Sequence, residues 1–181
     1  ADLFETYAVT MVASIVLAGI LVSGQLKETL MLYPLGIGAV CIFGSILGTF
    51  FVRLGASKNI MAALYKGLLA TSILSAIGIV GLTDWLIGLQ SVIEVGSQRL
   101  SGIDLCLCAF AGLIITGLLV WITEYYTSTR FRPVRSIAEA SLTGHATNII
   151  RGLAISMEAT VLPIFVISGG ILVTYHYAGL F

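Results

Sequence analysis

Residues 1–22 read ADLFETYAVTMVASIVLAGILV, an apolar run that is headed by two carboxylates, Asp2 and Glu5. A run of this length reaches the roughly 20 residues that a helix needs to cross a bilayer. Three positions apart on a helix, the two carboxylates share one face. A carboxylate at membrane depth costs about 2.5 to 3.5 kcal/mol on insertion scales, so such groups tend to face protein or water and to serve transport. From position alone, a transport role for Asp2 and Glu5 is no better supported than a role as solvent-exposed residues that cap the helix.

The composition of the chain indicates a membrane protein. Hydrophobic residues make up 58% of the 181 residues and charged residues 10%, whereas soluble domains carry roughly 25% charged residues. Nine basic and nine acidic residues cancel, which leaves no argument for nucleic-acid binding. We expect a single membrane domain over residues 1–181. Helix pattern is already under way at Ala1, without an initiator Met or a signal-peptide pattern, which suggests a fragment of a longer protein.

Four further stretches are long and apolar enough to span a membrane. The predicted fold class is therefore all-α, a polytopic membrane protein with five transmembrane helices at about 1–23, 34–53, 60–87, 105–123 and 147–177. Pro163 lies inside the last span and predicts a kink near Ala159, since proline removes one helical hydrogen bond.

The segments between the spans are polar. Residues 124–146 predict a cytoplasmic loop that contains a short helix, because Ser136 and Glu139 have capping-box spacing and Gly144 allows a break before the next span. Residues 89–104 read as a mixed-charge loop, part of which could form a short interfacial helix.

Small residues recur along one face of two neighbouring spans. The second span carries Gly36, Val40, Gly44 and Gly48 at four-residue intervals, and the third carries Gly67, Thr71 and Ser75. Such stripes allow a neighbouring helix to approach closely.

Loop charges predict the orientation of the chain. The loops after the second and fourth spans, with the helix ends beside them, hold seven of the nine basic residues: Arg53, Lys58, Lys66, Arg130, Arg132, Arg135 and Arg151. The opposite side holds Lys27 and Arg99. By the positive-inside rule, the N-terminus is cytoplasmic and the C-terminus lies on the other side of the membrane.

Few other residues have the pattern of a chemical site. Walker-type loops, H-E-x-x-H motifs and carboxylate-rich loops are missing from the sequence. Its remaining candidates are single residues in apolar or helix-end contexts, which read as structural: Cys41, Cys106, Cys108, His145 and His176. The basic loop from Arg130 to Arg135 could meet anionic lipid headgroups or an anionic substrate, although positive-inside topology alone explains it.

Glu158 is a carboxylate about two turns inside the fifth span. It lies seven residues after Arg151, on the same helix face but too far for a direct pair. A structural hydrogen-bonding role and an ion-relay role are both open.

Two stretches resemble the membrane-integral pyrophosphatases, which couple pyrophosphate hydrolysis to proton or sodium pumping. One is residues 1–10, ADLFETYAVT, and the other is residues 124–163, EYYTSTRFRPVRSIAEASLTGHATNIIRGLAISMEATVLP. The spans between them agree with the family in number and order, so the resemblance covers the whole chain. It implies a bacterial pyrophosphate-energized proton pump in which the five spans are the sixth through tenth helices of a sixteen-helix protomer.

The resemblance also implies roles for particular residues. Asp2 matches the gate aspartate below the hydrolytic centre, and Glu5 matches a glutamate tied to ion transport. Pyrophosphate and Mg²⁺ are held by aspartate-rich stretches outside these 181 residues, so this chain holds no catalytic residue and no metal ligand and is expected to be inactive alone. The residue that decides potassium dependence lies beyond Phe181, which leaves that property open. The family forms homodimers in the cell inner membrane, with the tenth helix near the dimer contact.

Two alternatives stand beside the proton pump. A sodium-pumping relative can carry a glutamate at the position of Glu5 as well. A non-enzymatic transporter or channel subunit, in which Asp2, Glu5 and Glu158 line an ion path, is the alternative from a different functional class.

Overall fold

The computed structural model describes residues 2–22, 24, 26–53, 60–95 and 98–179. The chain divides into two compact units, Ala1–Phe110 with Tyr175–Phe181, and Ala111–Thr174, and each is described by itself. Within the described residues, five helical segments are long and apolar enough to cross a membrane. The prediction of an all-α polytopic membrane protein with five spans is confirmed, while the single membrane domain stays a prediction.

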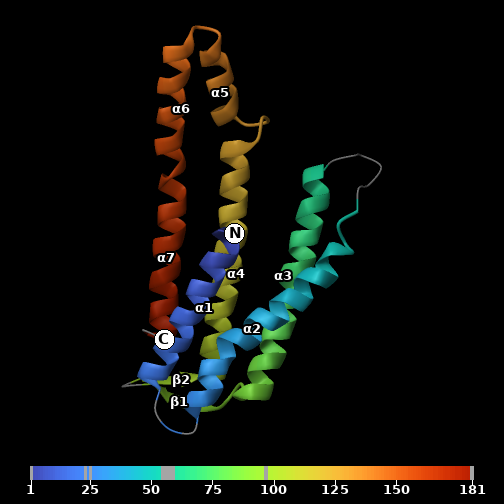
Figure 1. Cartoon of the computed structure of the whole chain (residues 1–181), viewed down its shortest axis with the longest axis vertical. Coiled ribbons are helices and arrows are strands. Elements are labelled where there is room, and N and C mark those ends of the chain that lie inside the picture. Colours follow the sequence, from blue (N-terminus) through green and yellow to red (C-terminus); the bar gives the residue numbers. More distant parts are fainter. Residues whose placement is uncertain (1, 23, 25, 54–59, 96–97, 180–181) are drawn as a thin grey trace. The chain divides into compact units, whose positions relative to one another are not determined.

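The first unit begins with three long helices, α1 (Asp2–Leu21), α2 (Leu26–Thr49) and α3 (Ile60–Leu86) (Figure 1). Their limits agree closely with the prediction except for α2, which begins at Leu26 and not at Pro34 and ends at Thr49, four residues before the predicted end at 53. Membrane helices tolerate an internal proline where neighbouring groups satisfy the freed backbone. Glu28, predicted in a polar turn, lies in the first helical turn, where a carboxylate interacts favourably with the helix dipole.

A β-hairpin replaces the predicted loop or interfacial helix between α3 and α4. Strands β1 (Val92–Val95) and β2 (Gln98–Ser101) pair antiparallel, with Ile93 opposite Leu100. Both of these side chains are buried, whereas Val92 is exposed. The alternation is that of a strand with one covered face, but four-residue strands are too short to show a clear period in the sequence.

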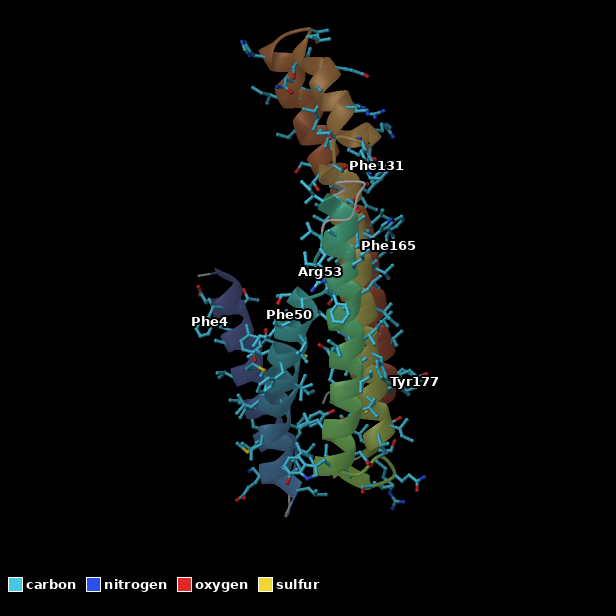
Figure 2. The ribbon with its side chains drawn as sticks, turned by 90° about the vertical axis from the view of Figure 1, so that its right-hand side faces the viewer. Phe4, Phe50, Arg53, Phe131, Phe165 and Tyr177 are labelled. Atoms are coloured by element: carbon cyan, nitrogen blue, oxygen red, sulfur yellow. The ribbon has the colours of Figure 1, made fainter. Side chains whose placement is uncertain are left out.

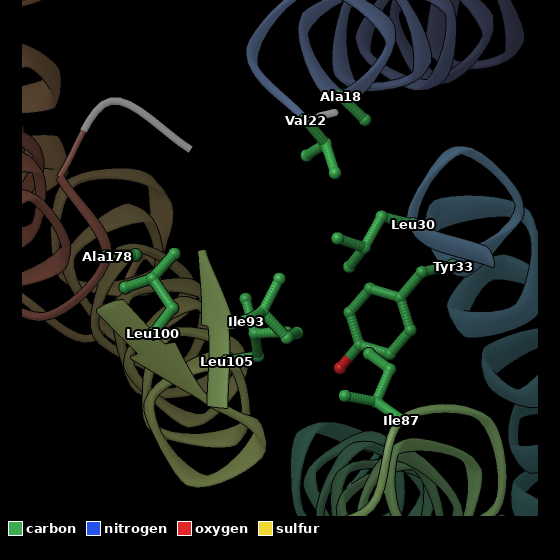
Figure 3. Packing of buried hydrophobic residues seen from close by; sticks show 9 residues of the cluster. All are labelled: Ala18, Val22, Leu30, Tyr33, Ile87, Ile93, Leu100, Leu105 and Ala178. Carbon is green, nitrogen blue, oxygen red and sulfur yellow. The ribbon is translucent and has the colours of Figure 1, made fainter. Parts of the chain in front are cut away.

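The hairpin closes one end of the first unit around a buried apolar cluster (Figure 3). The cluster gathers the end of α1, the start of α2, the end of α3, the hairpin, the start of α4 (Gly102–Thr127) and the end of α7 (Val161–Ala178). Its members are Ala18, Val22, Leu30, Tyr33, Ile87, Ile93, Leu100, Leu105 and Ala178. Segments far apart in the sequence are thus joined at this end.

The small-residue stripes of α2 and α3 pack against each other, as their spacing predicts. A Cβ added to Gly44 would lie 2.9 Å from Oγ of Ser75, and one added to Gly48 would collide with Thr71. On the other helix, a Cβ on Gly67 would collide with Val52. The backbones of α2 and α3 therefore approach each other so closely that only glycine fits at these positions.

The second unit holds the rest of α4 and α7 and a helical hairpin of α5 (Arg132–Ser141) and α6 (His145–Ala159) (Figure 1). The short helix in residues 124–146 is confirmed, but it starts before Ser136. Pro133 lies in its first turn, a position where the missing N–H costs little. The predicted capping box is wrong, because Oγ of Ser136 donates to the carbonyl of Pro133 at 2.8 Å.

Two predicted interruptions are present in the second unit. Gly144 separates α5 from α6 with φ of 138°, a backbone angle that favours glycine. The last span is broken into α6 and α7 at Thr160, one residue after the predicted kink near Ala159. Pro163 explains it, since the proline has no N–H to donate to the carbonyl of Ala159, whereas the carbonyl of Thr160 accepts from the amide of Ile164 at 3.2 Å.

Candidate functional site

The predicted site begins in the first turn of α1. The helix starts at Asp2, so Asp2 and Glu5 lie on one continuous helix, three positions apart. The side chain of Asp2 is outside the described part of the structure, and that of Glu5 is exposed. Figure 2 shows Phe4, from the same turn, projecting away from the helix axis. Nothing in the structure tests the roles of Asp2 and Glu5, which stay predictions.

The orientation of Glu5 follows from the residue two positions after it. Tyr7 lies over Gly38 of α2, where an added Cβ would collide with its hydroxyl and would lie 2.7 Å from Cε of Met11. Tyr7 and Met11 therefore mark the face of α1 that packs on α2. Two positions correspond to a rotation of about 200° around a helix, so Glu5 is on the opposite face from Tyr7.

An uncovered apolar strip continues from Glu5 along α1. Val9, Val12 and Val16 follow it at helical spacing and are 63%, 60% and 52% exposed. A membrane helix that carries a carboxylate on such a face needs lipid or protein against the strip, and the carboxylate favours protein or water. The described residues leave this face of α1 open to a partner helix.

Thr6, Thr10 and Ser14 form a ladder of hydroxyl-bearing residues along α1. This ladder was not predicted from the sequence. Oγ1 of Thr10 donates to the carbonyl of Thr6 at 2.8 Å, and Oγ of Ser14 donates to the carbonyl of Thr10 at 2.9 Å. The pattern T-x-x-x-T-x-x-x-S would have revealed it. The hydroxyls of Thr10 and Ser14 each donate their proton to a backbone carbonyl, so their oxygen lone pairs stay available to accept hydrogen bonds.

A cavity of about 300 Å³ lies beside Ser14, the last residue of this ladder, in the first unit. Its lining is mainly apolar, with polar atoms from Ser14, Tyr33 and Cys108. The other lining residues are Leu17, Pro34, Ile37, Leu105, Ala109 and Ala178. The cavity has no carboxylate in its lining, so it does not extend the Asp2/Glu5 site.

Glu158 lies in the last turn of α6 and is exposed. Its backbone carbonyl accepts a long hydrogen bond, 3.5 Å, from the hydroxyl of Tyr126. Nε of Arg151 donates to Oγ of Ser136 at 3.1 Å, so Arg151 ties α6 to α5. The role of the Glu158 side chain stays a prediction.

The described residues do not fit a magnesium site. No three His, Cys, Asp or Glu side chains among them lie close enough together to hold a metal ion. His145 is the first residue of α6, and the ring of His176 lies edge-on to that of Tyr177 with centroids 5.5 Å apart.

A family model described as inorganic H⁺ pyrophosphatase matches residues 1–181. The chain belongs to this family. The pyrophosphate-energized proton pump 2 of Mycoplana dimorpha is 53% identical over 167 residues, which cover 92% of this chain and 80% of that protein. The pyrophosphate-energized proton pump of Anaplasma marginale is 52% identical over 123 residues, 68% of this chain and 87% of the relative.

A much longer relative matches almost the whole chain. The K⁺-insensitive pyrophosphate-energized proton pump of Methanosarcina mazei is 43% identical over 179 residues, 99% of this chain and 24% of that pump. This H⁺ pyrophosphatase chain is thus a multi-pass membrane segment that corresponds to about a quarter of the long relative. The assignment of Asp2 and Glu5 to transport rests on resemblance to the family and stays a prediction, whereas the hydroxyl ladder and the apolar strip of α1 come from the structure.

Proposed function

We propose that this chain forms part of a pyrophosphate-energized proton pump, which couples hydrolysis of inorganic pyrophosphate to proton translocation across the cell inner membrane. The observation that carries the proposal is the match of the full chain to the H⁺ pyrophosphatase family, with relatives that are named proton pumps at up to 53% identity. The five membrane-spanning segments support a role in the membrane part of the pump.

In the proposed pump, Asp2 and Glu5 receive the proton that is transported. The geometry of α1 supports this assignment. Tyr7 and Met11 anchor the helix on α2 through Gly38, and Glu5 lies on the opposite face, at the head of the strip formed by Val9, Val12 and Val16. We assign this strip to contact with other helices of the pump, which would keep Glu5 in a protein interior and away from lipid.

Hydrolysis belongs to parts of the pump outside these residues. Pyrophosphate and Mg²⁺ are proposed to bind there, as the resemblance to the family implies. This chain then supplies part of the proton path and none of the phosphate chemistry. Glu158 is proposed as a structural or relay carboxylate near the junction of α6 and α7.

The orientation and the assembly of the pump are parts of the same proposal. The N-terminus is cytoplasmic, supported by the basic residues that follow α2 and α4, and the C-terminus is on the opposite side. The pump is proposed to be a homodimer. The family resemblance puts the dimer contact near the helix formed by α6 and α7, where Ile149, Ile150 and Leu153 of α6 are exposed.

The experiment is pyrophosphate-driven acidification of membrane vesicles that contain the full-length pump. Acidification is expected on addition of magnesium pyrophosphate, and a protonophore should abolish it. The assay is run with and without sodium. Acidification that needs sodium, or pyrophosphate-driven sodium uptake without acidification, would assign the pump to the sodium-transporting class, and phosphate release without either would contradict the proposal.

A further inference from the structure

Three arginines cluster where α4 ends and α5 begins. Arg130, Arg132 and Arg135 lie within six positions, and all three side chains are exposed. This junction belongs entirely to the second unit. Positive-inside topology accounts for the number of basic residues on this side of the membrane, but it does not require that they gather at one turn.

Aromatic side chains lie at the same junction. The ring of Tyr125 is edge-on to that of Tyr126, with centroids 5.0 Å apart, and lies 5.2 Å from the ring of Phe131. Tyr125 and Tyr126 belong to the last turn of α4, a membrane-spanning helix, and Phe131 directly precedes α5 (Figure 2). Tyrosines are enriched where a transmembrane helix reaches the headgroup layer. The cluster therefore marks the level at which the arginines meet the membrane surface.

Hydrogen bonds order the backbone of the turn and the side chain of Arg135. The amide of Ser128 donates to the carbonyl of Glu124 at 2.9 Å, and that of Phe131 donates to the carbonyl of Ser128 at 3.3 Å. Nε of Arg135 donates to the carbonyl of Thr129 at 3.2 Å, which leaves its terminal nitrogens available as donors. A turn that is already ordered loses little entropy when it binds a ligand.

The start of α5 adds a further positive element. Its N-cap is Phe131, whose side chain makes no capping hydrogen bond, and Pro133 occupies the first turn. The amino end of a helix carries a partial positive charge and exposed N–H groups, and it attracts phosphate. Arginine forks match the oxygen atoms of a phosphate in two-pronged geometry.

We propose that the α4–α5 junction binds the phosphate of an anionic phospholipid headgroup. Arg130, Arg132 and Arg135 bind the phosphate oxygens together with the amino end of α5, and Tyr125 and Phe131 pack against the glycerol and the first methylenes of the lipid. The aromatic cluster favours a lipid over a free phosphate ion, because an ion in water would gain nothing from the apolar rings. The inference goes beyond the proposed pump and holds for either transported ion.

The probe is phosphatidylglycerol, compared with phosphatidylcholine, on the purified detergent-solubilised protein, with retained lipid counted by native mass spectrometry. We expect phosphatidylglycerol to be retained and phosphatidylcholine to be lost. The single variant Arg132→Gln should weaken retention about fivefold, as expected for one basic residue near a lipid headgroup. The triple variant Arg130→Gln, Arg132→Gln, Arg135→Gln should weaken it more than tenfold.

A matched triple variant removes three positive charges elsewhere, with Lys27→Gln, Arg53→Gln and Lys66→Gln. It should retain phosphatidylglycerol like the unmodified protein. Equal loss in both triple variants would mean that only net charge matters and would overturn the site. Full retention in Arg132→Gln, or displacement of the lipid by millimolar inorganic phosphate alone, would overturn the assignment to a lipid headgroup.

Discussion

The hydroxyl of Tyr33 on α2 lies 2.8 Å from Oγ1 of Thr83 on α3, and both residues are buried. Oγ1 of Thr83 also donates its single proton to the carbonyl of Ile79 at 2.7 Å. Tyr33 must therefore be the donor in the contact between the two helices. This chain of two hydrogen bonds fixes the register of α2 against α3 at the end of the unit that the hairpin closes.

The order of donors predicts an asymmetric response to mutation. Thr83→Val removes the acceptor and leaves the buried hydroxyl of Tyr33 without its partner, which costs about 1 to 3 kcal/mol. Tyr33→Phe removes the donor alone and should cost about 0.6 kcal/mol, the average for hydrogen bonds between membrane helices. Unfolding of the purified protein in detergent measures both. A larger loss for Tyr33→Phe than for Thr83→Val would contradict the assigned direction.

The contact between α2 and α3 predicts that Gly44 cannot carry a side chain. In Gly44→Ala, the new methyl would lie 2.9 Å from Oγ of Ser75, and the overpacking should destabilise the protein by about 1 to 3 kcal/mol. Gly81→Ala on α3 is the control, because no atom lies within 4 Å of its added Cβ. Thermal unfolding should show a lower midpoint for Gly44→Ala only. Ser75→Ala in the same protein removes Oγ and should restore much of the loss, and failure to do so would refute the packing argument.

A reciprocal cap predicts where α4 is sensitive. Asp104 accepts from the amide and the hydroxyl of Ser101 at 2.9 and 2.8 Å, and its own amide donates to Oγ of Ser101 at 3.3 Å. Ser101→Ala should cost about 1 kcal/mol and speed hydrogen exchange at the amide of Asp104. Ser141→Ala is the control, since that hydroxyl only bonds back to Ile137. Equal exchange in both variants would contradict the cap.

The sequence predicted the parts of the fold that depend on long apolar runs and repeated spacing. The five spans and the contact between the Gly44 and Ser75 faces follow from such patterns. The segment between α3 and α4 and the start of α2 were predicted wrongly, because both depend on tertiary contacts, whereas the short helix in residues 124–146 and the breaks at Gly144 and near Ala159 were predicted correctly. The hairpin is stable only with Ile93 and Leu100 buried in the cluster, and the proline at residue 34 is internal to a helix that continues past it.

The two capping boxes show why a motif alone is insufficient. Ser136 and Glu139 have the required spacing, yet Pro133 starts the helix earlier and Ser136 turns to its carbonyl. The sequence S-G-I-D at residues 101–104 has the same kind of spacing and does form the cap, because the hairpin ends at Ser101. For the candidate site, the sequence alone shows that Asp2 and Glu5 form a carboxylate pair on α1. Whether this pair carries protons depends on groups elsewhere in the pump. The assignment of Asp2 and Glu5 therefore came from resemblance.

The orientation of Glu5 predicts that transport is more sensitive to it than hydrolysis. Glu5→Gln in the full-length pump keeps the size of the side chain and removes the proton-binding carboxylate. Pyrophosphate-driven acidification of vesicles should fall at least tenfold, while phosphate release in the presence of protonophore should fall less, because the described part of the chain brings no metal-ligand cluster to Glu5. Glu28→Gln is the control, an exposed carboxylate in the first turn of α2, and should leave both rates unchanged. Unchanged acidification in Glu5→Gln would remove Glu5 from the proton path, and an equal fall in both rates would place it in the hydrolytic machinery instead.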